Sequence, residues 1–362
     1  MNNEKLKMVQ EKIGYSFQNP KLLEQAFTHK SVGEGQIYTG SNEPFPMMGD
    51  DILQTIVTGM LAKYLVEIDP NSEKVTLKCS KEVFNTRKEE LISNTTLAGL
   101  IDALGFQDYL LLGNGGKKDK IQENVSVKAE LFKSILFAVF FDSNENFEVL
   151  KAVTSKMGLD VGSENKKMKE REKRGVEMMN NNMSINEQSN RLAENGNTLE
   201  LVQEKLNYQF CNVELLKQAF TRRSYSEEHN GAHHNEVLEF YGDKALEFIV
   251  MKKLSEHFGE ITQNGKYASQ KTEGQLTEFK KKLVCKKMLA HRIDVLDFAD
   301  CLLMGKGDEA QNAQDQESVK EDLFEAVVGA VALDSGWKIE ALTTVIDTML
   351  TTAFYFENGF AD

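Results

Sequence analysis

The stretch Asn235–Val250 reads NEVLEFYGDKALEFIV, and a related but altered stretch, NEPFPMMGDDIL, occupies Asn42–Leu53. In the first stretch, the apolar residues Leu238, Leu246 and Ile249 recur at the spacing of one helix face, which predicts an amphipathic helix. The two stretches begin 193 residues apart, close to half of the 362-residue chain. This spacing suggests that the chain carries two copies of one helical domain.

Two further pairs of stretches support the duplication. LLEQAFTHKS at Leu22–Ser31 matches LLKQAFTRRS at Leu215–Ser224, again 193 residues apart. VKAELFKSILFAVFFDS at Val127–Ser143 matches VKEDLFEAVVGAVALDS at Val319–Ser335 at an offset of 192. Chance similarity between helices does not preserve both the order and the spacing of three blocks, so we predict a duplicated domain.

The boundaries of the two repeats follow from a change in composition. Residues 166–174 read KKMKEREKR and are followed by an Asn- and Ser-containing stretch without apolar periodicity, which is typical of a linker. We predict a first domain at 1–158, a charged and polar linker at 159–198 and a second domain at 199–362. Helical spacing recurs throughout and no alternating strand pattern is found, so the expected fold class is all-α.

The composition of the chain argues against several classes of protein. The chain has a net charge of −13 and 41% hydrophobic residues, which suits packed cores and argues mildly against a nucleic-acid coat protein. No apolar run is long enough to span a membrane, and the first residues lack the apolar core of a secretory signal. The 4 cysteines form no CxxC pair, which argues against a disulfide framework. We therefore expect a cytoplasmic protein without a membrane association.

The chemical signal lies in the second repeat. Glu236, Glu239 and Asp243 are spaced i, i+3, i+7, and Asp322 and Glu325 are spaced i, i+3, so each set shares one helix face. Carboxylates on otherwise apolar helices are costly to bury unless a cation compensates them. Hard oxygen ligands select Mg²⁺, or Mn²⁺ as a substitute, and no small-molecule cofactor is indicated. The plainer interpretation, a solvated face of an amphipathic helix, remains open on spacing alone.

Two glycines favour the metal site over the solvated face. Gly242 and Gly329 lie one turn from the acidic residues, where a missing side chain lets two helices approach closely. Such an approach would bring the two carboxylate sets together. Other glycines, Gly113, Gly115, Gly305 and Gly307, lie in loops and lack the surroundings of a phosphate-binding loop.

These residues resemble a known family. The block NEVLEFYGD is similar to the signature of the ribonuclease III family, and EDLFEAVVGAVALDSG resembles the second catalytic helix of that family. The resemblance covers most of residues 199–340 and implies an all-α endonuclease domain that dimerises and cuts double-stranded RNA with Mg²⁺, leaving a 5′-phosphate and a 3′-hydroxyl. By motif match it implies catalytic, metal-binding roles for Glu239, Asp243, Asp322 and Glu325, and a further metal-binding position at Glu236.

The first repeat resembles the same family but departs from it at the site. Glu43, Asp50 and Glu130 keep their acidic character, whereas Pro46 stands in the place of Glu239 and Lys133 in the place of Glu325. Proline cannot bind a metal, and a lysine repels one. We therefore predict that the first repeat has lost catalysis. Its prolines, Pro44 and Pro46, would also disturb the helix interior, unless the helix begins later, near Met47. Phe137 also replaces the glycine that corresponds to Gly329.

The resemblance also implies partners. Double-stranded or hairpin RNA would contact basic clusters, of which the first choice is Arg222, Arg223, Lys280, Lys281 and Lys282. Lys286 and Lys287 belong to the same cluster as Lys280, Lys281 and Lys282, and another cluster in the first repeat consists of Lys117, Lys118 and Lys120. Phe240 is expected to insert into the partner domain, with Met47 as its counterpart, so that the two repeats pair within one chain as a pseudo-dimer. One working site would then give one cut per binding event.

Three questions stay open at the level of sequence. A non-catalytic protein that binds or scaffolds double-stranded RNA is the main alternative to an endoribonuclease. A zinc site at His229, His233 and His234 is a weak third idea, because the cysteines are distant. Ribosomal, messenger and interfering RNA precursors are equal candidates for the substrate. Only 25 residues follow Trp337, so we expect no separate double-stranded-RNA-binding domain there.

Overall fold

The computed structural model describes residues 1–33, 40–68, 75–77, 81–159, 161, 196–229 and 233–359. Almost all of the predicted linker at 159–198, including the basic stretch 166–174, lies outside these residues, and so does Cys79. The domain boundaries therefore remain a prediction. Among the helices of the described segments, none is both long and apolar enough to cross a lipid bilayer.

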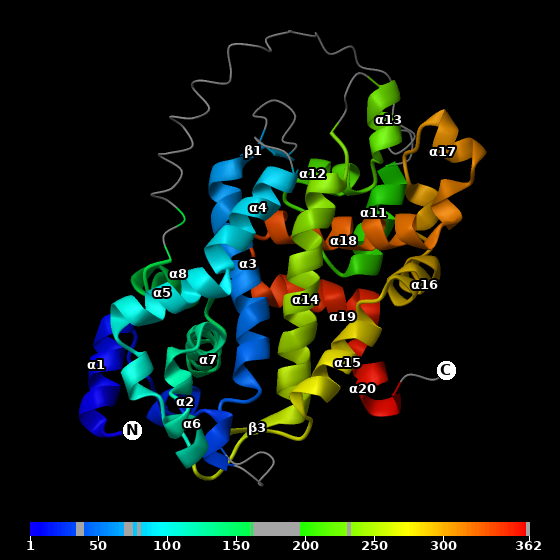
Figure 1. Cartoon of the computed structure of the whole chain (residues 1–362). Helices are drawn as coiled ribbons and strands as arrows, with labels where there is room; N and C mark the ends of the chain where they lie inside the picture. The colour runs from blue at the N-terminus through cyan, green and yellow to red at the C-terminus, as the bar shows by residue number, and fades with distance from the viewer. Residues whose placement is uncertain are drawn as a thin grey trace, which may run out of the picture. The chain divides into compact units, whose positions relative to one another are not determined.

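Repeat one, the part of the chain before the predicted linker, is mainly helical (Figure 1). Its elements are α1 (Asn3–Ile13), α2 (Pro20–Ala26), η1 (Lys30–Gly33), α3 (Phe45–Leu65), β1 (Val66–Ile68), β2 (Val75–Leu77), α4 (Lys81–Ile92), α5 (Asn94–Leu104), η2 (Gln107–Tyr109), α6 (Asn114–Lys118), η3 (Ile121–Glu123), α7 (Val125–Asp142) and α8 (Phe147–Lys156).

Repeat two, the part after that linker, has the same order of elements, except that an α-helix, α13, takes the place of the 3-10 helix η1, and one more helix follows. Its elements are α11 (Gly196–Leu206), α12 (Val213–Ala219), α13 (Arg223–Glu228), α14 (Glu236–Phe258), β3 (Gly259–Ile261), β4 (Tyr267–Ser269), α15 (Glu273–Leu283), α16 (Lys286–Leu296), η4 (Ala299–Cys301), α17 (Lys306–Ala310), η5 (Ala313–Asp315), α18 (Glu317–Asp334), α19 (Ile339–Leu350) and α20 (Thr352–Asn358).

The matching element order confirms the predicted tandem all-α fold, and local contacts repeat as well. In repeat one, Asp142 accepts hydrogen bonds from the Tyr15 hydroxyl at 2.8 Å and from the Asn19 amide at 2.7 Å. In repeat two, Asp334 accepts the equivalent bonds from Tyr208 and Asn212 at 2.8 and 2.7 Å. The same carboxylate therefore fixes the loop before the second helix of each repeat.

The sequence showed no strand pattern, but each repeat contains one short antiparallel hairpin within its otherwise helical fold. β1 pairs with β2 in the register Val66 to Leu77, and β3 pairs with β4 in the register Gly259 to Ser269. Each strand has only three residues. A period of two cannot be recognised over three residues, which explains why the alternation was not visible.

The helices of each repeat surround one largely buried helix. α7 contacts α2, α5 and α8, and α18 contacts α12, α16 and α19 (Figure 1). Both central helices are buried over most of their length, as in the fully buried residues Phe132, Ile135, Phe324 and Val327. Only the later parts of these helices, around residues 134–140 and 326–332, are buried on every side, as expected for a segment at the centre of a bundle.

The chain forms two compact units that do not follow the repeats exactly. Unit 1 contains 1–62, 82–165 and 251–278, and unit 2 contains 63–81, 166–250 and 279–362. Each unit thus includes the hairpin region of the other repeat. α14 is divided between them: its residues up to Val250 belong to unit 2, and the rest belong to unit 1.

Candidate active site

The site in unit 2 is built where α14 and α18 cross at two glycines. A Cβ atom at Gly242 would overlap the backbone carbonyl of Glu325, and one at Gly329 would overlap the carbonyl of Leu238. Only glycine permits this close approach of two helix backbones. The sequence prediction that these glycines bring two carboxylate-bearing helices together agrees with this geometry.

The predicted acids of the two helices are close enough to act on one another at this crossing. Glu325 is half-buried, and its burial, followed by the charges of Asp243, Glu239, Glu321 and Asp322, raises its pKa to about 9 from an ordinary 4.5. A carboxyl group with this pKa holds its proton at neutral pH when no cation is bound. The arrangement therefore favours either a proton on Glu325 or a bound cation.

Glu236 has a different environment from the other four predicted acids. Its carboxylate lies 3.6 Å from the Arg223 guanidinium and 3.9 Å from the His234 imidazole. It is also absent from the charges that raise the pKa of Glu325. The structure therefore groups Glu239, Asp243, Asp322 and Glu325, and it places Glu236 in an ion-paired position at the start of α14.

Lys244 is a site neighbour that the sequence reasoning missed. Its ammonium lies 2.9 Å from the Asp243 carboxylate and 3.4 Å from that of Glu247. Burial would lower the pKa of Lys244, but the charges of these two carboxylates raise it, so the lysine stays protonated. Repeat one has Asp51 at this position, and comparing the two repeats residue by residue could have drawn attention to Lys244.

Asp308 was also missed, and it organises the basic side of the site. Its carboxylate accepts hydrogen bonds from Arg222 Nε at 2.7 Å and from the Ser224 hydroxyl at 2.6 Å. Burial would raise the pKa of Asp308, but these two bonds and the guanidinium charge lower it. The guanidinium so held lies 4.0 Å from the carboxylate of Asp322. Repeat one has Gly116 at the position of Asp308, so a comparison of the two repeats could have shown that this acid occurs only in repeat two.

The residues present suit a divalent cation by their chemistry. Carboxylate oxygens are the ligands that Mg²⁺ and Mn²⁺ prefer, and a cation would oppose the burial and the neighbouring charges that together raise the pKa of Glu325. In the described segments, no three His, Cys, Asp or Glu side chains are already arranged as a ligand set. The donor set therefore fits such a cation in charge and in atom type, without a preformed ligand geometry. Within the described part of the chain, His229, His233 and His234 likewise do not form a ligand set for zinc.

The corresponding place in repeat one, within unit 1, has a different chemistry. The Lys133 ammonium lies 2.8 Å from the carboxylate of Asp50, so the side chain that replaces Glu325 is itself the cation. α3 begins at Phe45, so Pro46 lies in the first turn, where proline is tolerated. The helix start predicted near Met47 is thus two residues late. A Cβ at Gly49 would overlap the Lys133 carbonyl, so the close helix approach is retained.

The predicted RNA-binding residues fall into two groups. Arg222 is held by Asp308, while Arg223 contacts Glu227 at 2.9 Å and Glu236 at 3.6 Å, so both guanidinium groups pair with acids of the protein. Lys280, Lys281 and Lys282 form the last turn of α15, and the second and third of them are exposed. Of the remaining lysines, Lys286 lies 3.2 Å from Glu321, while Lys287 and the three lysines at 117, 118 and 120 are exposed.

The two residues predicted to mediate pairing are described separately, because they belong to different units. Phe240 is buried in unit 2, and its ring centroid lies 5.5 Å from that of Tyr241. Met47 belongs to unit 1, where its sulfur accepts a hydrogen bond from the Thr277 hydroxyl at 3.0 Å. Their predicted roles in pairing stay a prediction.

Comparison with known proteins gives one family. The sequence profile described as ribonuclease-III-like matches residues 19–161 and 212–353. Ribonuclease 3 of Roseburia hominis is 53% identical over 165 residues, which are 42% of this chain and 46% of that protein. Ribonuclease 3 of Treponema succinifaciens is 48% identical over 156 residues, which are 43% of this chain and 42% of that protein. The chain thus spans less than half the length of these two relatives.

A partial similarity to a solved structure is also found. The nuclease domain of ribonuclease III from Campylobacter jejuni is similar to this chain with a TM-score of 0.37 and 28% identity. The similarity covers 43% of this chain and 98% of that domain.

Proposed function

The chain belongs to the ribonuclease III family, and from this premise we propose that it is a Mg²⁺-dependent endoribonuclease that cleaves double-stranded or structured RNA at a single site, in repeat two. The products would carry a 5′-phosphate and a 3′-hydroxyl. The observation that supports this most is the contrast between the two repeats: four acids crowd the α14–α18 crossing, whereas Lys133 pairs with Asp50 in repeat one.

In this proposal the four acids of repeat two share the task of holding a cation, and two basic side chains orient them. Glu239, Asp243, Asp322 and Glu325 would hold the cation, which when bound supplies an activated water and charge stabilisation for the leaving 3′ oxygen. Lys244 holds the Asp243 carboxylate in place, and Arg222, fixed by Asp308, lies beside Asp322. These contacts orient the acids before RNA arrives, which lowers the cost of assembling the site.

Substrate binding would rely on phosphate contacts. Double-stranded RNA is recognised mainly by shape, by its 2′-hydroxyls and by its phosphates, and Lys281 and Lys282 offer exposed positive charge on α15. Arg222 and Arg223 pair with acids of the protein, and Lys280 also lies 3.7 Å from Glu247, so ion pairing does not separate the arginines from the lysines. We assign Arg222 to the site because its guanidinium lies 4.0 Å from Asp322, and Lys281 and Lys282 to RNA because their side chains are exposed on α15.

The test compares matched variants of the two repeats on a labelled RNA duplex. Asp243→Asn or Glu325→Gln should abolish cleavage in Mg²⁺ while RNA binding, measured by gel shift in EDTA, stays within about twofold, since a lost metal ligand removes chemistry rather than phosphate contacts. Asp50→Asn in repeat one is the matched control and should leave the cleavage rate unchanged. Normal cleavage by both repeat-two variants would refute the site assignment.

The non-catalytic alternative makes the opposite prediction for the unmodified protein. A scaffold that only binds double-stranded RNA would shift the duplex in a gel with or without Mg²⁺ and would leave it intact over hours. Cleavage that requires Mg²⁺ or Mn²⁺ and stops in EDTA excludes that alternative.

A further inference from the structure

The ring of Tyr267, on β4 of repeat two, is enclosed within unit 1 by rings of repeat one. The residue is only 1% exposed. Its ring centroid lies 5.9 Å from that of Phe45 and 5.3 Å from those of Phe137 and Phe141. The ring planes meet at steep angles, the edge-to-face geometry that aromatic pairs favour. We call Phe45, Phe137 and Phe141 the aromatic socket.

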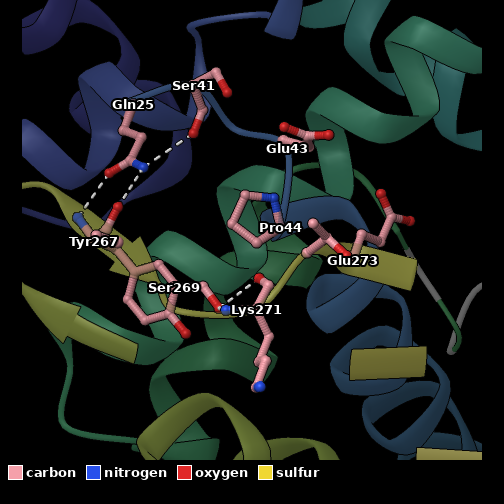
Figure 2. Close-up of a pocket in the computed structure, with 10 residues that line it drawn as sticks. Gln25, Ser41, Glu43, Pro44, Tyr267, Ser269, Lys271 and Glu273 are labelled. Carbon is pink, nitrogen blue, oxygen red and sulfur yellow. Dashed lines mark hydrogen bonds between the residues drawn. The ribbon is translucent and has the colours of Figure 1, made fainter. Parts of the chain in front are cut away.

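The backbone of Tyr267 is held by a side chain of repeat one (Figure 2). The Gln25 amide nitrogen donates to the Tyr267 carbonyl at 2.8 Å, and the Gln25 carbonyl oxygen accepts from the Tyr267 amide at 2.8 Å. Gln25 is 1% exposed, so both bonds are shielded from water. A buried amide that pairs with both backbone groups of one residue fixes the position of the strand, because a lost bond would leave a buried polar group unsatisfied.

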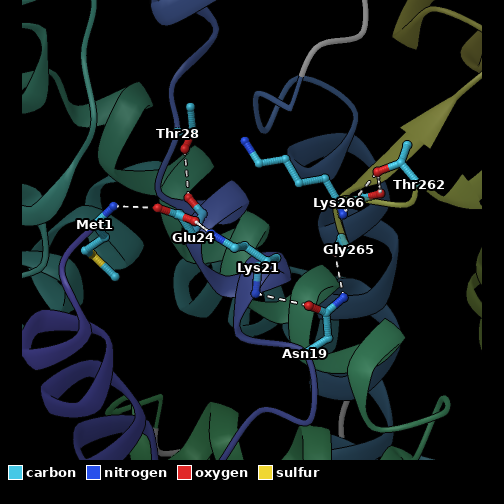
Figure 3. A network of polar contacts seen from close by, with 8 residues as sticks. All are labelled: Met1, Asn19, Lys21, Glu24, Thr28, Thr262, Gly265 and Lys266. Atoms are coloured by element: carbon cyan, nitrogen blue, oxygen red, sulfur yellow. Dashed lines mark hydrogen bonds and ion pairs between the residues drawn. The ribbon is translucent and has the colours of Figure 1, made fainter.

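Two more contacts place the rest of this segment. At the hairpin turn, the Asn19 amide donates to the Gly265 carbonyl at 2.6 Å (Figure 3). Before the hairpin, the Lys252 ammonium lies 3.1 Å from the Glu145 carboxylate and is nearly buried. Beside Tyr267 a cavity of about 100 Å³ remains, lined by Glu43, Pro44 and Glu273 among others. The segment 251–278 is therefore held at its helix, its turn and its second strand.

The aromatic residues of the socket occur only in repeat one, and the aromatic residue that fills it occurs only in the hairpin of repeat two. At the positions of Phe45, Phe137 and Phe141, repeat two has Leu238, Gly329 and Leu333. At the position of Tyr267, the hairpin of repeat one has Val75, as the registers of the two hairpins show. An aromatic insert and an aromatic socket thus occur together only when the hairpin of repeat two meets repeat one.

The late start of α3 explains how repeat one accommodates the socket. In repeat two, a Cβ atom at Gly329 would overlap the Leu238 carbonyl, because α14 already runs as a helix from Glu236. In repeat one, the helix begins at Phe45, which is the counterpart of Leu238 itself. Phe137 is then fully buried, with its ring 4.7 Å from that of Phe45. The socket residues Phe45, Phe137 and Phe141 thus lie on the same two helices as Pro46 and Lys133.

We propose that Tyr267 and the aromatic socket determine which repeats pair. The socket of repeat one accepts the hairpin of repeat two, and repeat two, which lacks the socket, does not accept the same hairpin from a second copy. The partner of this surface is thus repeat two of the same chain, and pairing between two copies of repeat two is disfavoured. The inference is independent of RNA cleavage, because no residue of the α14–α18 site takes part in it.

The experiment uses the full chain with a protease site inserted within residues 174–182 and a different affinity tag on each end. After cleavage of the folded protein, co-purification of the halves at decreasing concentration gives their dissociation constant. Tyr267→Ala should weaken the association at least about 100-fold, since it removes a fully buried ring. Tyr267→Phe, which loses only the 3.0 Å hydrogen bond to the Ser255 carbonyl within repeat two, should stay within about tenfold. Ile261→Ala, at an exposed hairpin position, should change nothing.

A second readout addresses the choice of partner. Cleaved proteins carrying two different tags on repeat two are mixed, and the two repeat-two halves should not co-purify with each other. If Tyr267→Ala is not recovered folded, Phe141→Leu decides the question, because it introduces the repeat-two residue at a half-buried position and should weaken association about tenfold. Unchanged association of the Tyr267→Ala or Phe141→Leu halves overturns the proposal, as does pairing of repeat-two halves with each other as tight as with repeat one.

Discussion

Replacing Glu325 with a residue that cannot ionise should stabilise the metal-free protein, and more so at higher pH. In the unfolded chain this carboxyl ionises near 4.5, whereas in the folded chain its pKa is about 9. Between these values the folded state binds one proton more than the unfolded state, so the free energy of unfolding falls as the pH rises. Glu325→Gln cannot ionise and does not lose this stability.

The magnitude follows from the width of the pH interval. A full proton difference changes the free energy of unfolding by about 1.4 kcal/mol per pH unit. Water reaches the half-buried carboxyl and screens part of its interactions, so we expect about half of that value. From pH 6 to pH 8 the advantage of Glu325→Gln should grow by about 1.4 kcal/mol, which corresponds to about 3–5 °C in the melting temperature of a unit of this size.

Thermal melting in EDTA at pH 6, 7 and 8 measures this difference directly. The variant and the unmodified protein are compared at each pH, so that other titrating groups cancel. Mg²⁺ at millimolar concentration should raise the melting temperature of the unmodified protein most at pH 8, because a cation favours the ionised carboxylate. A difference between the two proteins that is constant over the three pH values would refute the raised pKa of Glu325.

Three further outcomes follow. Asp308→Ala should lower the cleavage rate about 10- to 100-fold, as expected when a residue that orients the site is lost, and Asp308→Glu should recover part of it in the same duplex assay. Gly242→Ala should cost about 1–3 kcal/mol or more in urea unfolding, whereas Gly307→Ala, which has open space around its Cβ, should cost under about 0.5 kcal/mol. Pro46→Glu together with Lys133→Glu should restore Mg²⁺-dependent stabilisation of repeat one, measured as a second Mg²⁺-sensitive melting transition; a melting curve that Mg²⁺ changes no more than that of the parent protein would contradict it.

Much of the fold could be predicted from the sequence, because it depends on periodicity and repetition. Blocks such as Asn42–Leu53 and Asn235–Val250 carry apolar residues at helical spacing, and their common order gives the tandem arrangement. The hairpins were missed because their strands have three residues each. The exchange of segments between the units could not be predicted, since it depends on contacts such as Gln25 with Tyr267, which are 242 residues apart.

The candidate site, like the fold, could be predicted from the sequence only in part. Glu239 and Asp243 are recognisable because they share one helix face with a family signature, and Gly242 because a close helix approach needs a glycine. The Arg222–Asp308 pair joins residues 86 positions apart, and no local pattern indicates it. Pro46 indicated that the helix of repeat one begins later than its counterpart in repeat two, and it does. It begins at Phe45, two residues before Met47, because a proline is tolerated in the first turn of a helix.

The central claim, one working site in repeat two of a chain whose repeats pair with each other, is tested most directly by the products from a long RNA duplex labelled on either strand. At early times we expect each cleaved molecule to carry one cut on one strand, so a denaturing gel shows fragments while a native gel still shows the full-length duplex. Each fragment should end in a 5′-phosphate and a 3′-hydroxyl. Double-strand breaks with a fixed overhang from the earliest time points, at a rate that is second order in protein, would show that two chains pair through their active repeats and would contradict the claim.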